Sequence, residues 1–155
     1  MNLTLFLENE FATTRFGESL AQYLSAGDIL AITGPLGSGK TSLARAIIGR
    51  LSADDEVTSP TYGLVSTYET PGFLIWHYDL FRLSQKNEIW ELGFEDAMDD
   101  GVVLIEWPEI IADILPSDTL SISMQAQADG RKIRLEGGGE WPEKLTRLGE
   151  SFVTN

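Results

Sequence analysis

The residues that decide the fold are ILAITGPLGSGKT, numbers 29–41 of the chain. Their second part, GPLGSGKT at 34–41, matches the phosphate-binding pattern G-x-x-x-x-G-K-[ST] at every defined position. Glycines let backbone N–H groups wrap around a phosphate, and the N-terminus of a following helix adds about half a positive charge. In this pattern Lys40 reaches the β- and γ-phosphates, and the Thr41 hydroxyl ligates Mg²⁺. The stretch therefore predicts a nucleotide-binding loop rather than an ordinary glycine-rich turn.

The segments next to this loop have the periodicities of strands and helices. The apolar run at 29–33 predicts a strand buried on both faces, and a helix is expected from about Lys40 to Leu51. Upstream, residues 3–7 alternate as a strand does. A helix follows this strand, because apolar side chains recur at helical spacing at Phe16, Leu20 and Leu24. For that helix we expect Thr13 or Thr14 as the N-cap and Gly27 as the stop.

Downstream of the loop, short apolar runs predict further strands, at 63–69, 73–78 and 102–106. The acidic segment 86–99 between the last two of these runs is expected to be helical. The tail at 119–136 alternates across Asp129-Gly130 as a hairpin does, and a short helix is expected from about Trp141. Together these elements predict one domain, residues 1–155, with an α/β P-loop NTPase fold. Its mixed central sheet is expected to be flanked by helices and to carry a C-terminal hairpin.

Composition narrows the functional classes. The 155 residues include 24 acidic and 11 basic side chains, which gives a formal net charge of −13. The chain has no cysteine and a single histidine, His77, so thiolate zinc sites and cysteine nucleophiles are excluded. No apolar run approaches the ~20 residues that span a bilayer, so we expect a cytoplasmic protein without a membrane segment. The acidic balance argues against tight direct binding to nucleic acid.

Three further pieces could complete a nucleotide site. The run VVLIE ends in Glu106, a position suited to holding Mg²⁺ beside a phosphate-binding loop. A second strand-like run ends in Asp79, which could orient the attacking water, support the metal, or be an ordinary surface carboxylate. In the segment 57–62, Pro60 favours an extended backbone that would leave Thr61 free to approach a γ-phosphate. The alternative for this segment is a proline turn before a strand.

In their order and spacing these motifs resemble the TsaE (YjeE) family, the small ATPases of tRNA threonylcarbamoyladenosine synthesis. The resemblance rests on GPLGSGKT, SPTY followed by GLV, HYDLFRL at 77–83 and LIEWPE at 104–109, and it spans about residues 10 to 136. It implies Mg²⁺ on Thr41 and Glu106, and functional roles for Thr61, Asp79 and Trp107. The loop residues that it implies for ATP or ADP are Leu36, Gly37, Ser38, Gly39, Lys40 and Thr41.

The same resemblance implies an adenine pocket between the N-terminal segment and the tail hairpin. Phe11 and Gly130 are then candidate base contacts, although Phe11 could equally belong to the core. It also implies protein partners similar to TsaD and TsaB. Because no arginine finger is evident in the sequence, we expect slow ATP hydrolysis by the chain alone and faster hydrolysis with these partners.

Several residues have two interpretations. His77, between Trp76 and Tyr78, is more often structural than catalytic in such a setting, and Trp107 either packs in the core or closes over the nucleotide. The segment 84–118 holds ten acidic residues against Lys86 alone. This segment is either a solvated face or a docking surface for a basic protein. The apolar anchors expected for such a surface are Ile89, Trp90 and Phe94.

The catalytic set predicted from the sequence is Lys40, Thr61, Asp79 and Glu106. One alternative class is a small-molecule P-loop kinase, although the seven arginines are scattered rather than gathered in a lid segment. A GTPase would be expected to carry an N-K-x-D motif, which this chain lacks. A nucleotide-gated binding module with negligible hydrolysis is the third alternative. Release of inorganic phosphate separates a hydrolase from a kinase, and competition of ATP against GTP separates it from a GTPase. Variants of Lys40 and Glu106 separate it from a binding module, because loss of catalysis would leave such a module's partner function unchanged.

Overall fold

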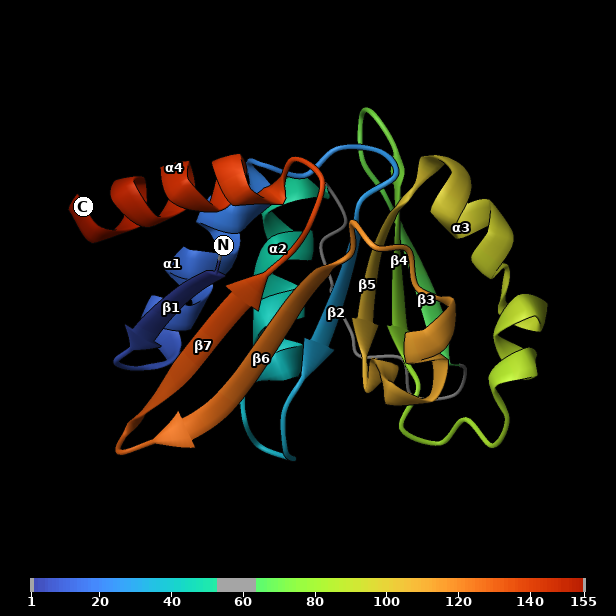
Figure 1. Ribbon diagram of the computed structural model, residues 1–155, viewed down its shortest axis with the longest axis horizontal. Coiled ribbons are helices and arrows are strands. Elements are labelled where there is room, and N and C mark those ends of the chain that lie inside the picture. The colour runs from blue at the N-terminus through green and yellow to red at the C-terminus, as the bar shows by residue number, and fades with distance from the viewer. Residues whose placement is uncertain (1, 53–63, 155) are drawn as a thin grey trace.

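The computed structural model describes residues 2–52 and 64–154, which form one mixed sheet with helices around it (Figure 1). The strand order is β1-β7-β6-β2-β5-β4-β3. The strands are β1 (Asn2–Leu7), β2 (Ile29–Thr33), β3 (Val65–Glu69), β4 (Leu74–Asp79), β5 (Val102–Glu106), β6 (Leu120–Gln127) and β7 (Gly130–Glu136). The helices are α1 (Glu10–Ala21), α2 (Lys40–Leu51), α3 (Phe94–Asp100), α4 (Trp141–Thr154) and the 3₁₀ helices η1 (Lys86–Leu92) and η2 (Pro108–Ile114).

The central strands are parallel and the outer ones antiparallel. β2 pairs in parallel with β5 on one side and β6 on the other, and β4 pairs in parallel with β5. Antiparallel pairs of β1 with β7, β6 with β7 and β3 with β4 complete the sheet. Because β2, β5 and β4 run in the same direction, their carboxyl ends meet at one edge of the sheet. The predicted α/β fold with a mixed sheet is confirmed.

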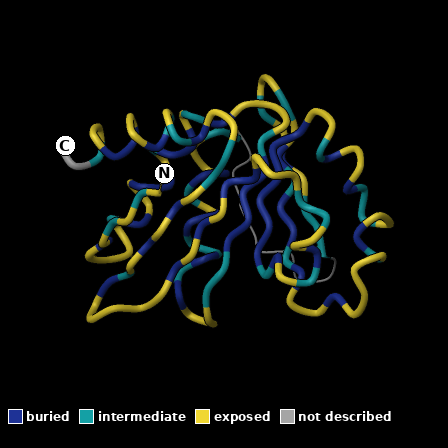
Figure 2. Tube along the Cα trace, in the orientation of Figure 1, coloured by how far each residue is buried: buried dark blue, intermediate teal, exposed yellow. Residues whose placement is uncertain are grey.

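The core consists of two apolar clusters, one on each face of the sheet. Figure 2 shows that the central strands between them are buried. Alternate residues of β2 supply both, since Leu30 and Ile32 join the cluster under α1, α2 and α4, whereas Ile29 joins the cluster under η1, α3 and η2. Residues of β5 divide in the same way. The uninterrupted apolar run at 29–33 therefore marks a strand covered on both faces, as predicted.

The helix before the loop begins and ends earlier than predicted. Its N-cap is Asn9, whose Oδ1 accepts the N–H of Ala12 at 2.8 Å. Thr13 and Thr14 lie inside α1, so the N-cap prediction was wrong. An asparagine followed by Glu10 caps the helix well, because the side chain satisfies a free N–H and the carboxylate favours the positive helix end. The predicted stop was also wrong, since Gly27, at φ +96°, belongs to the turn before β2.

Two other segments differ in detail from the prediction. The acidic segment expected to be one helix is divided into η1 and α3 by Gly93, whose φ of +74° interrupts a right-handed helix. The hairpin is confirmed, but Gly130 pairs with Gln127 in the ladder, so the turn is made by Ala128 and Asp129. The last helix begins at Trp141 as predicted and extends over 14 residues. Within the described ranges, no helix has the length and apolar character needed to cross a bilayer.

Candidate nucleotide and metal site

The predicted phosphate loop connects the carboxyl end of β2 to the N-terminus of α2. Gly34, Gly37 and Gly39 all have positive φ values, +149°, +79° and +101°. A Cβ at Gly34 would also lie 2.6 Å from Ser38 Oγ and collide with the Met124 carbonyl. The loop therefore requires glycine at 34 for its shape and for its approach to β6. Ser38 is 1% exposed and its hydroxyl has no partner among the described residues, which suits a loop that receives an oxygen-rich ligand.

Lys40 is held inside this loop. Its ammonium donates to the carbonyls of Gly34 and Pro35, the second at 3.0 Å, and lies 4.0 Å from the centroid of the Trp107 ring. Burial lowers the pKa of Lys40, and the negative charge of Glu106 opposes this shift. The loop carbonyls and the indole face thus stabilise a cation that is only 4% exposed. A phosphate would offer the same ammonium a stronger partner.

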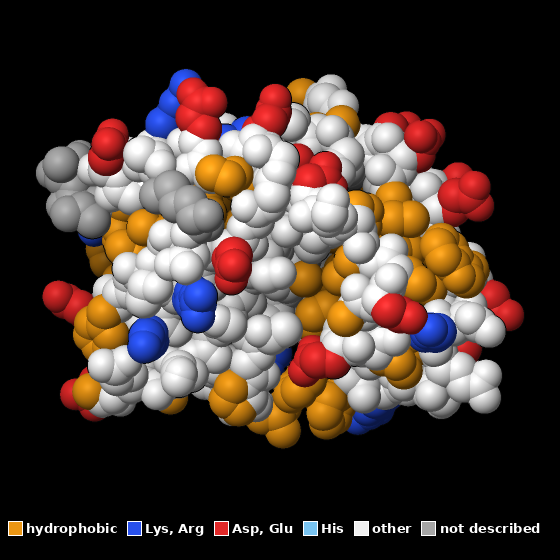
Figure 3. Space-filling model, viewed as in Figure 1, with side chains coloured by type: hydrophobic (Ala, Val, Ile, Leu, Met, Phe, Trp, Pro, Cys, Tyr) orange, Lys and Arg blue, Asp and Glu red, His pale blue; other side chains and the backbone are white. Residues whose placement is uncertain are grey.

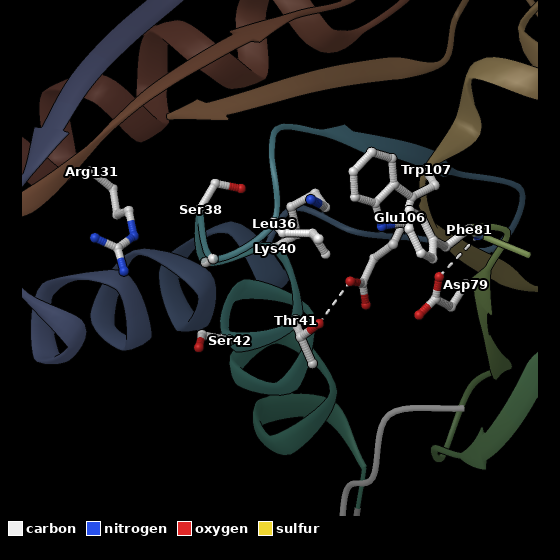
Figure 4. A pocket seen from close by; sticks show the side chains of 12 residues that line it. Leu36, Ser38, Lys40, Thr41, Ser42, Asp79, Phe81, Glu106, Trp107 and Arg131 are labelled. Carbon is white, nitrogen blue, oxygen red and sulfur yellow. Dashed lines mark hydrogen bonds between the residues drawn. The ribbon is translucent and has the colours of Figure 1, made fainter. Parts of the chain in front are cut away.

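Glu106 forms the other side of the site. It ends β5 with 2% exposure, and its two carboxylate oxygens have different partners. Oε1 accepts the Thr41 hydroxyl at 2.7 Å, and Oε2 lies 2.6 Å from His77 Nε2 (Figure 4 shows the contact with Thr41). Burial alone would raise the pKa of Glu106, but the hydrogen bond and charge of His77, then Thr41 and Lys40, hold that pKa below its ordinary value. The carboxylate is therefore kept ionised beside the Thr41 hydroxyl.

His77, for which the sequence favoured a structural role over a catalytic one, contacts the Glu106 carboxylate at the candidate site. It is 0% exposed, and its Nδ1 has no hydrogen-bond partner among the described residues. The pairing of His77 with Leu104 and of Asp79 with Glu106 puts the three polar side chains on the same face of neighbouring parallel strands. The signal in the sequence was the spacing of two between His77 and Asp79, at the end of a strand.

Asp79 lies at the end of β4, next to Glu106 in register. One of its carboxylate oxygens accepts the N–H of Phe81 at 3.2 Å, and the Phe81 ring lies 4.9 Å from the Trp107 ring. Trp107 adopts φ +58° and ψ +56°, in the left-handed region, so the chain turns sharply directly after Glu106. Trp107 therefore lies over Lys40 at the site, and it also packs, partly buried, against the apolar cluster under η1, α3 and η2.

A cavity of about 380 Å³ contains most of the predicted site (Figure 4). It is lined by Leu36, Gly37, Ser38, Gly39, Lys40, Thr41, Ser42, Asp79, Phe81, Glu106, Trp107 and Arg131. Arg131, at the start of β7, was not predicted. It reaches the loop from the tail hairpin, and its Nη1 donates to the Gly130 carbonyl at 3.0 Å. Its position next to the predicted base contact Gly130 was the available signal.

The remaining predicted residues lie elsewhere. Phe11 is on α1, 70% exposed, and does not line the cavity; it is not a core residue. Gly130 is buried against the Leu7 carbonyl, with space for no side chain. Contact of these two with adenine stays a prediction. Thr61 and Pro60 lie outside the described residues.

The arrangement suits a polyphosphate with a hard cation. A helix N-terminus, loop N–H groups and Lys40 favour anionic oxygens, while Thr41 and Glu106 supply the hydroxyl and carboxylate oxygens that Mg²⁺ prefers. In the described part of the chain, no three His, Cys, Asp or Glu side chains form a metal-binding cluster. Mg²⁺ fits such a site, because it commonly uses one or two protein ligands together with phosphate and water oxygens.

Comparison with known proteins gives one consistent family. The model of the family described as "Threonylcarbamoyl adenosine biosynthesis protein TsaE" matches residues 7–133. The chain is 39% identical to the tRNA threonylcarbamoyladenosine biosynthesis protein TsaE of Rickettsia felis, over 83% of this chain and 76% of that protein. It is 34% identical to the protein of the same name from Haemophilus influenzae, over 99% and 96% of the two chains.

A solved structure shows the same architecture. The crystal structure of YdiB from Bacillus subtilis superimposes with a TM-score of 0.76 at 25% identity. The match covers 97% of this chain and 96% of that chain. Sequence and structure comparisons therefore extend over the phosphate loop, the strand that ends in Glu106 and the tail hairpin.

Proposed function

The chain belongs to the TsaE family of threonylcarbamoyl adenosine biosynthesis proteins, and from this membership we propose that it is a Mg²⁺-dependent ATPase. We further propose that its ATP hydrolysis supports the modification of tRNA by acting on a complex of TsaB-like and TsaD-like proteins. The observation that carries the proposal is the meeting of the Thr41 hydroxyl with Glu106, at 2.7 Å, beside the buried cation of Lys40.

ATP binding is assigned to the loop and its lysine. The loop N–H groups and the N-terminus of α2 would hold the phosphates, and Lys40 would leave its carbonyl partners for the β- and γ-phosphate oxygens. Arg131 reaches the same cavity from β7 and is suited to a phosphate or the ribose. Thr41 and Glu106 would hold Mg²⁺, which neutralises phosphate charge when bound. His77 keeps the Glu106 carboxylate ionised and oriented.

Hydrolysis is assigned to water as the acceptor. A bond forms between the water oxygen and the γ-phosphorus, and the bond from that phosphorus to the ADP oxygen breaks. Asp79 lines the cavity next to Glu106 and is suited to orient the water and accept its proton. Lys40 and the loop N–H groups stabilise the charge that develops on the phosphoryl oxygens. Among the described residues, Arg131 is the one arginine that lines the cavity, and it is assigned to nucleotide binding. Because no further arginine is there to act as a finger, we expect slow turnover without partners.

The test measures release of inorganic phosphate from ATP, with Mg²⁺ or with a chelator, by the chain alone and with TsaB-like and TsaD-like proteins from the same organism. We expect slow Mg²⁺-dependent release that rises when both partners are added, and formation of modified tRNA only with ATP. Release of phosphate also separates this function from a small-molecule kinase, which would retain the phosphoryl group on an acceptor. Absence of hydrolysis under every condition would refute the proposed activity.

A further inference from the structure

Two large apolar side chains are exposed at the nucleotide cavity. Leu36 and Phe81, 74% and 55% exposed, both line it. Figure 3 shows hydrophobic side chains along the lower edge of the molecule, the edge at which β2, β4 and β5 end in Figure 1. The prediction of Ile89 and Phe94 as anchors for a partner was wrong, because both are fully buried in the core under η1 and α3. Phe81 brings an aromatic ring, and no charge, to a site for phosphates, so its contacts indicate what it does.

A tight turn after β4 fixes the backbone of Phe81. The N–H of Leu80 donates to the Glu106 carbonyl at 3.0 Å, and the N–H of Leu83 donates to the Leu80 carbonyl at 3.0 Å. Both leucines are buried, so the turn is anchored in the core while Phe81 between them stays exposed. The N–H of Phe81 donates to the Asp79 carboxylate at 3.2 Å (Figure 4). The place of this ring is therefore set by the ends of β4 and β5, the two strands that carry the site carboxylates.

The Phe81 ring packs against Trp107. Their ring centroids are 4.9 Å apart and their planes are inclined by 46°, a separation typical of favourable aromatic pairs. The centroid of the Trp107 ring in turn lies 4.0 Å from the Lys40 ammonium, and Lys40 is only 4% exposed. Phe81 thus contacts the ring that covers the lysine.

The backbone of Trp107 does not by itself secure this cover. Its φ of +58° and ψ of +56° lie in the left-handed region, which is uncommon for a residue with a bulky side chain. Contacts of the surrounding structure have to offset the cost of such a conformation. Trp107 packs, partly buried, against the apolar cluster under η1, α3 and η2, and Phe81 adds an aromatic contact from the cavity lining. Loss of the Phe81 ring would therefore free the indole to move away from Lys40.

We infer that Phe81 is a positioning residue for the proposed ATPase reaction: its ring holds the Trp107 indole over the Lys40 ammonium and keeps water away from that cation. This inference rests on the proposed function, in which Lys40 stabilises the charge that develops on the phosphoryl oxygens. A cation acts on that charge more strongly in a site from which water is excluded. Phe81 acts through Trp107 and Lys40, because its own side chain has no charge and no hydrogen-bonding group.

The first test compares Phe81→Ala, Phe81→Leu and Phe81→Tyr in ATP hydrolysis and in ATP binding by the full chain. We expect Phe81→Ala to lower the turnover number about tenfold while the dissociation constant for ATP changes less than about threefold, because the ring acts on Lys40 during hydrolysis. Phe81→Leu, which keeps apolar bulk but no ring, should also turn over more slowly than wild type. Phe81→Tyr retains the ring and should restore turnover to within about twofold of wild type.

The second test reads the position of the indole without any turnover of ATP. The chain contains only four lysines, so ¹³C-labelled lysine gives few side-chain NMR signals, and Lys40→Arg identifies that of Lys40. In wild type the ring current of Trp107 should shift the ε-CH₂ signal of Lys40 upfield. Phe81→Ala should move this signal towards that of an exposed lysine, whereas Phe81→Tyr should leave it in place. Lys144, whose ammonium lies 4.9 Å from the Trp141 ring centroid, is an internal control, and its signal should not move.

Phe6→Ala is the matched control for loss of an exposed ring. Phe6 is 47% exposed, but it lies on the edge strand β1 and does not line the cavity. This variant should leave the Lys40 signal in place and keep turnover and ATP affinity within about twofold of wild type. Phe81→Ala and Phe6→Ala should unfold at similar urea concentrations, since each removes a ring that is about half exposed.

The outcomes separate this inference from the proposed function. Unchanged turnover in Phe81→Ala, or a Lys40 signal that does not move, would refute the positioning role. An equal loss of turnover and of ATP affinity would show that Phe81 contacts the nucleotide directly, which also refutes it. In these cases wild type still hydrolyses ATP and the proposed ATPase stands. If wild type hydrolyses no ATP under any condition, the proposed function is refuted and the role of Phe81 in hydrolysis is refuted with it.

Discussion

The hydrogen bond between His77 and Glu106 allows a sharp prediction about stability and pH. Replacing His77 with Ala leaves a carboxylate that is 2% exposed without the donor that lies 2.6 Å from Oε2. Leaving a buried carboxylate without its partner costs about 3 to 5 kcal/mol. We expect the free energy of unfolding at pH 7 to fall by that amount, and His77→Gln, which can still donate, to lose less.

The pH dependence of this loss has a definite sign. In the wild-type chain the pKa of Glu106 is lowered, so its contribution to stability is present above the unfolded-state pKa and is lost as the pH falls through the folded-state pKa. In His77→Ala, burial acts with less opposition and the pKa of Glu106 rises. The stability difference between the two proteins should therefore be large at pH 7 and should shrink as the pH falls and Glu106 becomes protonated.

The assay is urea unfolding of wild type, His77→Ala and His77→Gln at a series of pH values. Ile75→Ala is the matched control, because Ile75 is also fully buried on β4 but carries no charge. Its loss of about 2 to 5 kcal/mol comes from a cavity and should change little with pH. A loss below about 1 kcal/mol for His77→Ala at pH 7, or a loss as independent of pH as that of Ile75→Ala, would refute this account of His77.

Three further predictions concern the cavity. Asp79→Asn should lower the turnover number for ATP about a hundredfold, because Asp79 is assigned to orient the attacking water, while ATP affinity changes less than about threefold. An equal loss of turnover and of affinity would show that Asp79 acts in binding instead. Arg131→Ala should weaken ATP binding about tenfold and leave urea unfolding unchanged, since Arg131 lines the cavity and is half-buried. An unchanged ATP affinity in a titration would exclude a contact between Arg131 and the nucleotide. Gly34→Ala should lower the free energy of unfolding by more than about 1 kcal/mol and abolish ATP binding, because the new Cβ would collide with Ser38 Oγ and the Met124 carbonyl. Normal ATP binding by this variant would contradict the conclusion that the loop requires glycine at position 34.

Local patterns were sufficient for much of the fold. The apolar runs that became β2 and β5 indicated strands covered on both faces. Alternation around Asp129-Gly130 indicated the hairpin of β6 and β7, but its register differs, because the turn is made by Ala128 and Asp129. The predicted start of α1 was wrong, because Asn9, a few residues before the predicted threonine caps, is the N-cap. The division at Gly93 was also missed, because the residues on both sides of it have helical periodicity.

The candidate site divides in the same way. Lys40, Thr41 and Glu106 could be predicted because each belongs to a contiguous motif whose chemistry depends on near neighbours in the chain. The partner of Glu106 could not, since His77 meets it only through the parallel pairing of β4 with β5, 29 residues away in sequence. Arg131 enters the cavity only because the strand order places β6 beside β2 and β7 beside β6.

The sequence by itself determined that this acidic chain carries a phosphate loop between a buried strand and a helix, with a carboxylate at the end of another buried strand. Those features depend on backbone preferences and periodicity, which act over a few residues. Only the tertiary structure decided which side chains surround them: His77 behind Glu106, Trp107 over Lys40, and Trp90 exposed while Ile89 and Phe94 are buried. Those relations depend on strand order and on which helix covers which face, and both are set by packing between segments that are distant in the chain.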